Sequence, residues 1–174
     1  MVLYKNFSIK EYRDDIQKLK GINVNGLVYV QVYHTEKETE KVIEISKSDD
    51  LVRGIVGWTD LKSENVELNL TRLKEMSNGK LVGIRHLTQY EDFSWVWQDE
   101  VQRGLSCLEK MNLVYDLSFD PPCLKHAPKL AVKFPKLTFV IDHMAKPEGK
   151  NFEREAWFED MKNASKYPNM FCKL

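Results

Sequence analysis

The sequence predicts an α/β protein built around a parallel sheet, and two observations carry that prediction. Short apolar runs alternate with amphipathic stretches along the chain, at the repeat length of a strand, a helix and two loops. The run at 137–141 is apolar on both faces of a strand, as expected when helices bury both faces. An open sheet covered on both sides and a closed (β/α) barrel both satisfy these observations.

Six strands are expected from the apolar runs, at residues 27–32, 52–58, 81–87, 113–119, 137–142 and 170–174. The first two helices are predicted from their start signals. Ser8 with Glu11, and Thr35 with Glu38, match the capping box, in which the two side chains satisfy each other's backbone N–H groups.

The later helices are predicted from caps and apolar stripes. Ser63 can cap one helix, and Asp120 before Pro121 matches an N-cap followed by proline in the first turn. Apolar residues recur at helical spacing in four stretches: Val66, Leu70 and Leu73; Trp97, Val101, Leu105 and Leu108; Leu124, Ala127, Ala131 and Phe134; Trp157, Met161 and Ala164. The predicted order is one helix, five strand–helix units and a final strand.

The composition limits the kinds of partner and the location that we expect for this protein. The 174 residues hold 26 Lys plus Arg and 26 Asp plus Glu, so the formal net charge is zero, and we expect neither a nucleic acid nor an anionic membrane as partner. The apolar runs are far shorter than the roughly 20 residues that span a bilayer. Residues 1–10 lack the apolar core of a secretory signal. Three cysteines, odd in number and widely spaced, favour a reducing, cytoplasmic location.

Polar residues end five consecutive predicted strands. In open parallel sheets and in barrels alike, sites form at the carboxyl ends of the strands. Buried polar groups also need partners, so a converging polar site explains these residues together. They are Gln31; Trp58, Thr59 and Asp60; Arg85 and His86; Asp116; and Asp142, His143 and Lys146. Neighbours on a strand point to opposite faces, so one of Arg85 and His86, and one of Asp142 and His143, should face inward.

The side chains suggest roles, each with a structural alternative. Arg85 is suited to pair with a substrate carboxylate through two parallel hydrogen bonds. His143, with an acid and an amine close by, is suited to ligate a metal or to polarise a carbonyl group. Asp116 and Asp60 also fit helix caps or loop anchors, and Gln31 could bond neighbouring backbone. No dinucleotide-binding, Walker, nucleophile-elbow or HExxH motif occurs.

Six blocks of sequence together resemble a known family. They are Val30-Gln31, Gly54-Ile55-Val56-Gly57-Trp58-Thr59-Asp60-Leu61, Leu81-Val82-Gly83-Ile84-Arg85-His86-Leu87, Leu113-Val114-Tyr115-Asp116-Leu117, Phe139-Val140-Ile141-Asp142-His143-Met144-Ala145-Lys146-Pro147 and Pro168-Asn169-Met170-Phe171-Cys172-Lys173-Leu174. In order and spacing they resemble the amidohydrolase-related proteins, in the lactonase branch that holds L-fuconolactonase and 2-pyrone-4,6-dicarboxylate lactonase. The resemblance implies a TIM barrel.

In that family the site gathers an HxH pair from the first strand, a histidine from a later strand and an aspartate from the eighth. His143 matches the later-strand histidine by its Asp-His-x-x-Lys-Pro context, and is implied as the catalytic residue and as a metal ligand if the other ligands are supplied. Arg85 matches a substrate-holding arginine. The remaining residues expected to bind substrate are His86, Gln31, Trp58, Asp116 and Lys146.

The sequence also departs from the family. It contains no HxH pair, and its blocks begin after the first strand and stop before the eighth. Since a complete (β/α)₈ barrel needs about 250 residues, we expect residues 1–174 to form a partial TIM barrel of about six of the eight units, with open sheet edges that favour association. A divalent metal such as zinc is implied for a longer parent, and none is expected in this chain alone.

The implied function is hydrolysis of a sugar-type or carboxylated lactone by attack of water on the carbonyl, with a small lactone or sugar acid as partner. This 174-residue chain should have little activity by itself. Two alternatives stay open: a non-catalytic α/β domain that binds a small acid, and a metal-dependent decarboxylase of the same family. An HxH-bearing strand upstream and an aspartate-bearing strand downstream in the coding sequence would favour hydrolysis.

Overall fold

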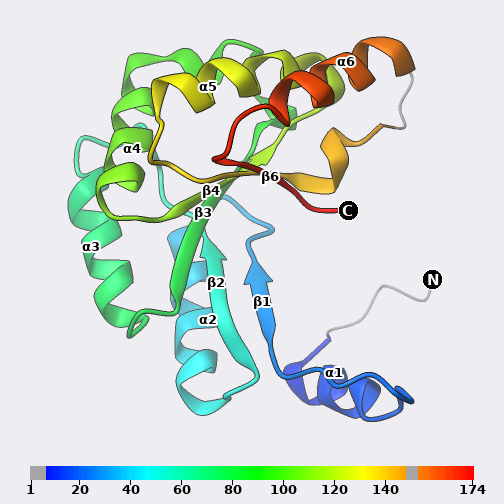
Figure 1. Cartoon of the computed structure of the whole chain (residues 1–174). Coiled ribbons are helices and arrows are strands. Elements are labelled where there is room, and N and C mark those ends of the chain that lie inside the picture. The colour runs from blue at the N-terminus through cyan, green and yellow to red at the C-terminus, as the bar shows by residue number, and fades with distance from the viewer. Residues whose placement is uncertain (1–6, 148–152) are drawn as a thin grey trace.

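Six parallel strands form one curved sheet, in a computed structural model that describes residues 7–147 and 153–174 (Figure 1). The strand order follows the chain from β1 to β6. The strands are β1 Leu27–Val30, β2 Val52–Gly57, β3 Leu81–Leu87, β4 Val114–Ser118, β5 Phe139–Ile141 and β6 Met170–Cys172. The main helices are α1 Ile9–Ile16, α2 Glu36–Ser48, α3 Val66–Met76, α4 Asp99–Lys110, α5 Ala127–Lys133 and α6 Arg154–Ala164. The predicted α/β class and partial barrel are confirmed.

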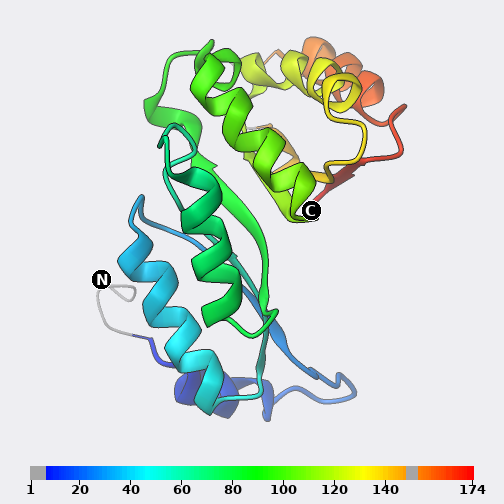
Figure 2. The same cartoon turned by 90° about the vertical axis from the view of Figure 1, so that its left-hand side faces the viewer.

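One face of the sheet packs against helices α2 to α6, which lie along its convex side, whereas α1 lies by the start of β1 (Figures 1 and 2). Ile84, Tyr115 and Phe139 are neighbours in register across β3, β4 and β5, and all three are fully buried. Phe139 meets Phe134, at the end of α5, with ring centroids 6.5 Å apart. The core of the protein therefore fills the space between the sheet and its outer helices.

The register places a different row of residues on the opposite, concave face. Arg85, Asp116, Val140 and Phe171 are neighbours across β3 to β6. Parallel strands in register turn such neighbours to the same face, so charged groups and apolar groups share the inside of the curve. The concave face is where the chemistry predicted from the strand ends must lie.

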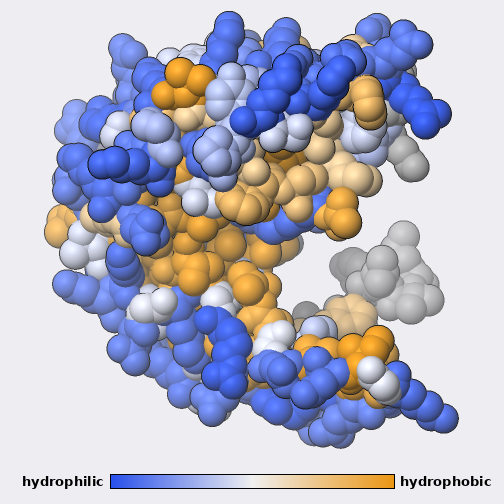
Figure 3. All heavy atoms as spheres, viewed as in Figure 1, coloured by the Kyte–Doolittle hydropathy of each residue, from blue (hydrophilic) through white to orange (hydrophobic). Residues whose placement is uncertain are grey.

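Part of the concave face is apolar and open (Figure 3). Val28 and Phe171 each keep 55% of their surface exposed, and Val82 keeps 38%. Within the described residues, no strand pairs with the outer edge of β1 or of β6. No helix in the same part of the chain is long and apolar enough to cross a bilayer.

Of the two predicted capping boxes, one forms and the other does not. Ser8 and Glu11 form the predicted capping box. Thr35 caps α2 through the N–H of Lys37, but the predicted partner Glu38 does not complete a box. Its carboxylate instead accepts from the Tyr29 hydroxyl, at 2.5 Å, and from backbone N–H groups of the loop after β1. A contact between elements has replaced the local one.

The two other start signals have mixed outcomes. The helix α3 begins at Val66, with Asn65 rather than Ser63 in the cap position, and Ser63 accepts from the N–H of Asn65 one turn earlier. Asp120 does precede a helical turn that starts with proline, Pro121–His126, which leads into α5. Its carboxylate pairs with Lys146 instead of capping the turn.

Candidate functional site

Five polar side chains meet at the carboxyl ends of the strands, and we call them the polar network: Gln31, Arg85, Asp116, Asp142 and Lys173. Arg85 and Asp116 lie side by side in register on β3 and β4, and the other three follow directly after β1, β5 and β6. All parallel strands end at the same edge of the sheet. This shared edge brings together residues that are more than 50 positions apart in the sequence.

Arg85 is bound on several sides by the protein itself. Its Nε donates to Gln31 Oε1 at 3.1 Å, its Nη1 donates to Asp142 Oδ2 at 2.9 Å, and its Nη2 donates to the backbone carbonyl of Gln31. The side chain is only 10% exposed. Arg85 thus ties the ends of β1, β3 and β5 together.

The side-chain amide of Gln31 is only partly used by the polar network. Gln31 is fully buried, and its Nε2 has no hydrogen-bond partner among the described residues. A buried donor without an acceptor is costly. The unused NH₂ group of Gln31 is therefore available beside the Arg85 guanidinium and suits an acceptor oxygen.

Lys173 closes the other side of the network. Its Nζ donates to Asp142 Oδ1 at 2.8 Å and to Asp116 Oδ2. The lysine side chain is 36% exposed, whereas the two aspartates are exposed by only 0% and 1%. Among these four charged groups, two positive and two negative, Lys173 is the one that solvent reaches most.

Burial and neighbouring charges shift the pKa values of Lys173 and Asp116 in opposite directions. Burial lowers the pKa of Lys173, but the two carboxylates outweigh it and hold that pKa above its ordinary value. Burial raises the pKa of Asp116, and the ammonium of Lys173 offsets that rise only in part. Lys173 is therefore a fixed positive charge at neutral pH.

A second group, which we call the ring stack, consists of His34, Trp58, His86 and Trp95. The His86 ring lies between His34 and Trp95, with centroid separations of 4.0 and 4.1 Å. Trp58 Nε1 donates to His86 Nδ1 at 3.2 Å, so the imidazole carries its proton on Nε2 and donates to Glu91 at 2.9 Å. Burial lowers the pKa of both histidines, which keeps the stack neutral at pH 7.

Two histidines of the ring stack form a group of three possible metal ligands with Glu91. His34, His86 and Glu91 each place a ligand atom within 4.8 Å of the others. Both nitrogens of His86 are already hydrogen-bonded, and His34 Nε2 accepts from the N–H of Leu87 at 2.9 Å. The His34 and His86 rings are also stacked face to face, so the lone pairs in their ring planes do not point toward a common centre. This donor set does not fit a catalytic zinc, which typically uses three free protein ligands.

His143 lies on a left-handed turn. The four residues from His143 to Lys146 all have φ between 50 and 56°, a conformation that costs roughly 1–2 kcal/mol per residue for L-amino acids. The turn is held by a bond from Met144 N–H to the Lys173 carbonyl at 3.0 Å, and by Trp157 Nε1, which donates to the Met144 carbonyl at 2.8 Å. Backbone strain of this kind clusters at functional sites.

The side chains on this turn are disposed differently. His143 is exposed, and its ring has no hydrogen-bond partner among residues 7–147 and 153–174. Lys146 donates to Asp120 at 2.9 Å and to Gln89 at 3.2 Å. The turn therefore presents an imidazole that is unengaged by the described protein and an amine that is already paired.

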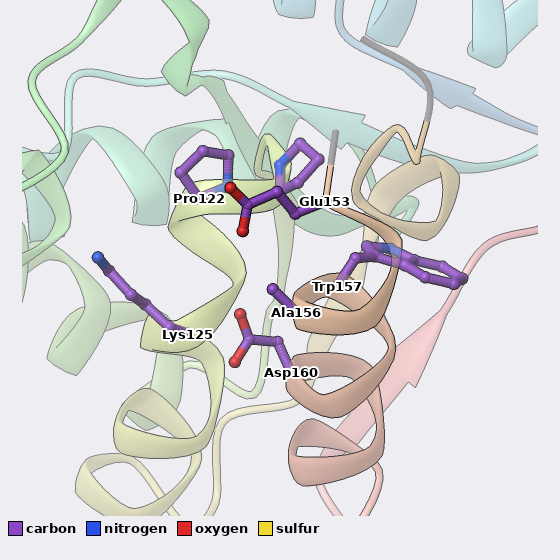
Figure 4. A pocket seen from close by; sticks show the side chains of 7 residues that line it. Pro122, Lys125, Glu153, Ala156, Trp157 and Asp160 are labelled. Carbon is purple, nitrogen blue, oxygen red and sulfur yellow. The ribbon is translucent and has the colours of Figure 1, made fainter. Parts of the chain in front are cut away.

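A cavity of about 370 Å³ lies beside this region, between the turn Pro121–His126 and α6 (Figure 4). Its wall carries Lys125, Glu153 and Asp160 together with Trp157. None of the residues predicted from the strand ends lines it. The cavity adjoins the candidate site through Trp157, which also holds the left-handed turn.

The residues predicted from the sequence separate into three places. Gln31, Arg85 and Asp116 belong to the polar network, Trp58 and His86 to the ring stack, and His143 and Lys146 to the left-handed turn. As expected for neighbours, Arg85 joins one group and His86 the other. Of Asp142 and His143, only the aspartate is buried. Whether these residues bind substrate or catalyse stays a prediction.

Sequence reasoning missed Lys173, Glu91 and His34. Lys173 carried the same signal as the residues that were found, because it directly follows the apolar run of β6. Glu91 and His34 lie in loops beyond the strand ends, where a strand-end rule does not reach. Their part in the site depends on how the loops fold back over β3.

Comparisons with known proteins extend these observations. A family model described as "Amidohydrolase" matches residues 24–174. An L-fucono-1,5-lactonase of Burkholderia ambifaria is 30% identical over 94% of this chain, and an L-fucono-1,5-lactonase of Burkholderia multivorans is 25% identical over 84%. The chain spans 58% and 51% of the length of these two relatives.

Solved structures show the same fold. An amidohydrolase from Burkholderia multivorans with bound zinc superposes with a TM-score of 0.85 at 23% identity, covering 99% of this chain and 60% of that one. A probable 2-pyrone-4,6-dicarboxylic acid hydrolase from Acinetobacter baumannii with citric acid bound superposes at 0.66 and 16% identity, covering 85% of this chain and 53% of that one.

Proposed function

Because this chain belongs to the amidohydrolase family, we propose that the protein hydrolyses a small lactone by attack of water on the carbonyl. The family resemblance of the six sequence blocks is confirmed. The observation that carries the proposal is the 30% identity, over 94% of this chain, to an L-fucono-1,5-lactonase. The polar site at the carboxyl ends of the strands supports it, because that is where barrel enzymes hold their substrates.

Hydrolysis defines what the site must do. The hydroxyl group of water bonds to the carbonyl carbon, the ring C–O bond breaks, and the ring oxygen takes up the remaining proton, which gives a hydroxy acid. A positioned donor that polarises the carbonyl accelerates the attack. We assign this role to His143, whose exposed ring is unengaged by the described residues and lies on a strained turn.

The substrate class proposed is a sugar-type or carboxylated lactone. The side chains proposed to line its site are Gln31, Trp58, His86, Asp116 and Lys146. Arg85 is the proposed anchor for a substrate carboxylate or hydroxyl group. It would have to exchange one of its bonds to Gln31 or Asp142 for a bond to the substrate.

Among the described residues, the three-donor group of His34, His86 and Glu91 does not fit zinc, because both nitrogens of His86 and Nε2 of His34 are hydrogen-bonded and the two rings are stacked. We further propose a cytoplasmic location, which is supported by three free cysteines, two of them buried.

The test is a lactone panel. Protein expressed from the complete coding sequence is incubated with aldono-1,5-lactones, aldono-1,4-lactones and a carboxylated pyrone, and proton release is followed with a pH indicator. We expect turnover of at least one compound above its spontaneous rate, and a loss of about 10²-fold or more in kcat for His143→Ala. His126→Ala is the control and should keep activity, because His126 lies outside the left-handed turn and accepts from Trp97 Nε1. No turnover across the panel, or full activity in His143→Ala, would contradict the proposal. Release of carbon dioxide instead would indicate a decarboxylase.

A further inference from the structure

The ammonium group of Lys173 combines three properties that no other charged group of the polar network shares. The lysine side chain is the most exposed of the four, at 36%. The ammonium group is held by ion pairs with two carboxylates that are almost fully buried. The backbone carbonyl of Lys173 accepts from the N–H of Met144, so the turn that carries His143 is bonded to the same residue.

The polar network does not use all the N–H donors of the Lys173 ammonium. A lysine ammonium has three N–H donors, and the network uses two, one for Asp116 and one for Asp142. The third has no acceptor among the described residues. Because both aspartates are buried and the lysine side chain is 36% exposed, we infer that the remaining donor can be reached from the solvent side.

The surroundings favour a small organic ligand at this donor. Phe171 lies two positions before Lys173, on the same face of the extended chain, and is 55% exposed. An apolar surface beside one fixed N–H donor suits a molecule that has a carbon ring and an acceptor oxygen.

From these contacts we propose that Lys173 is a catalytic residue that, together with His143, donates a hydrogen bond to the carbonyl oxygen of the lactone. The inference rests on the proposed function and extends it to a residue absent from the predicted set. Asp116 and Asp142 act as positioning residues, because they hold the ammonium in place before substrate arrives. A donor fixed in advance stabilises the charge that develops on the carbonyl oxygen without further reorganisation.

The experiment removes the ammonium and then returns it in solution. Lys173→Ala should lower kcat/KM for the best lactone by about 10²–10³-fold, the usual effect of losing one such donor. Added ethylammonium should restore part of that loss in a saturable manner. Lys166→Ala, which removes an exposed lysine bonded to Asn163, should lose no activity and should not respond to the amine.

The outcomes separate the two proposals. A wild-type protein that opens no lactone overturns the function and the role of Lys173 with it. If the wild type is active, a folded Lys173→Ala with undiminished kcat/KM, or a loss that no amine concentration restores, overturns the role of Lys173 alone. Should Lys173→Ala not fold, Lys173→Arg decides, because it keeps the positive charge for both aspartates. A fall in kcat at an unchanged unfolding midpoint supports the proposal, and unchanged kinetics overturns it.

Discussion

Arg85 illustrates how one buried charge organises the ends of three strands. Replacing it with methionine removes the donors that Asp142 and Gln31 accept from. Asp142 is fully buried, and leaving such a charge with one partner fewer costs roughly 3–5 kcal/mol. We therefore expect Arg85→Met to lower the free energy of unfolding by about that amount, as measured by urea denaturation.

The control is another arginine–aspartate pair of similar geometry. Arg13 meets Asp49 at 2.6 Å, but its side chain is 45% exposed. Exposed pairs contribute about 0–1 kcal/mol, so Arg13→Met should have a small effect. Equal losses in the two variants would show that burial is not what makes Arg85 important.

At this scale the sequence could indicate which residues matter but not how they pair. Gln31, Arg85 and Asp116 were found because each ends an apolar run. That Arg85 bonds Gln31 and Asp142, while its neighbour His86 turns to Trp58 and Glu91, follows from the side on which each strand presents its residues. One sequence does not specify that choice, because a single bulge reverses it, and β2 and β3 do carry such an irregularity.

Among the elements, the left-handed turn His143–Lys146 is the one whose backbone strain should most directly lower the free energy of unfolding. Met144 adopts φ 52°, which a glycine tolerates without steric cost, although glycine also adds freedom to the unfolded chain. We expect Met144→Gly to raise the free energy of unfolding by about 0.5–1 kcal/mol, measured by thermal and urea denaturation.

The same substitution in a helix should act in the opposite sense. Met161 lies within α6 and packs against the core. Met161→Gly should cost at least about 1 kcal/mol, from helix propensity alone. A loss of stability in Met144→Gly that matches the loss in Met161→Gly would argue against strain in the turn.

The helix starts show where local patterns are sufficient. Ser8 and Glu11 form their capping box, in which each side chain accepts from the backbone N–H of the other residue. Glu38 has the same local pattern but lies under the loop after β1, where a tyrosine hydroxyl and two N–H groups need an acceptor. The left-handed turn had no local signal at all, since none of its residues is glycine.

For the molecule as a whole, the open concave face is the feature that bears on behaviour in solution. Val28 and Phe171 are exposed on it, near the outer edges of β1 and β6, with which no strand of residues 7–147 and 153–174 pairs. Exposed strand edges and apolar patches favour association. We expect purified chain 1–174 to show a mass above 20.4 kDa that rises with concentration in light scattering coupled to size-exclusion chromatography.

Charge on the concave face should reverse that association. The double variant Val28→Glu with Phe171→Glu should shift the mass toward the monomer. Leu68→Glu is the matched control, because Leu68 is 68% exposed but belongs to α3 on the convex side, and it should leave the association unchanged. A wild-type chain that stays at 20.4 kDa over a wide range of concentrations would refute the expectation.

The strictly sequential order of the strands also bears on how the protein is made. Every strand from β2 to β6 pairs with the one that precedes it in the chain. During synthesis, each strand that emerges from the ribosome thus meets a neighbour that is already available, and none waits for a distant segment. A pause in translation leaves a sheet that is shorter by whole units, never one with a gap in its middle.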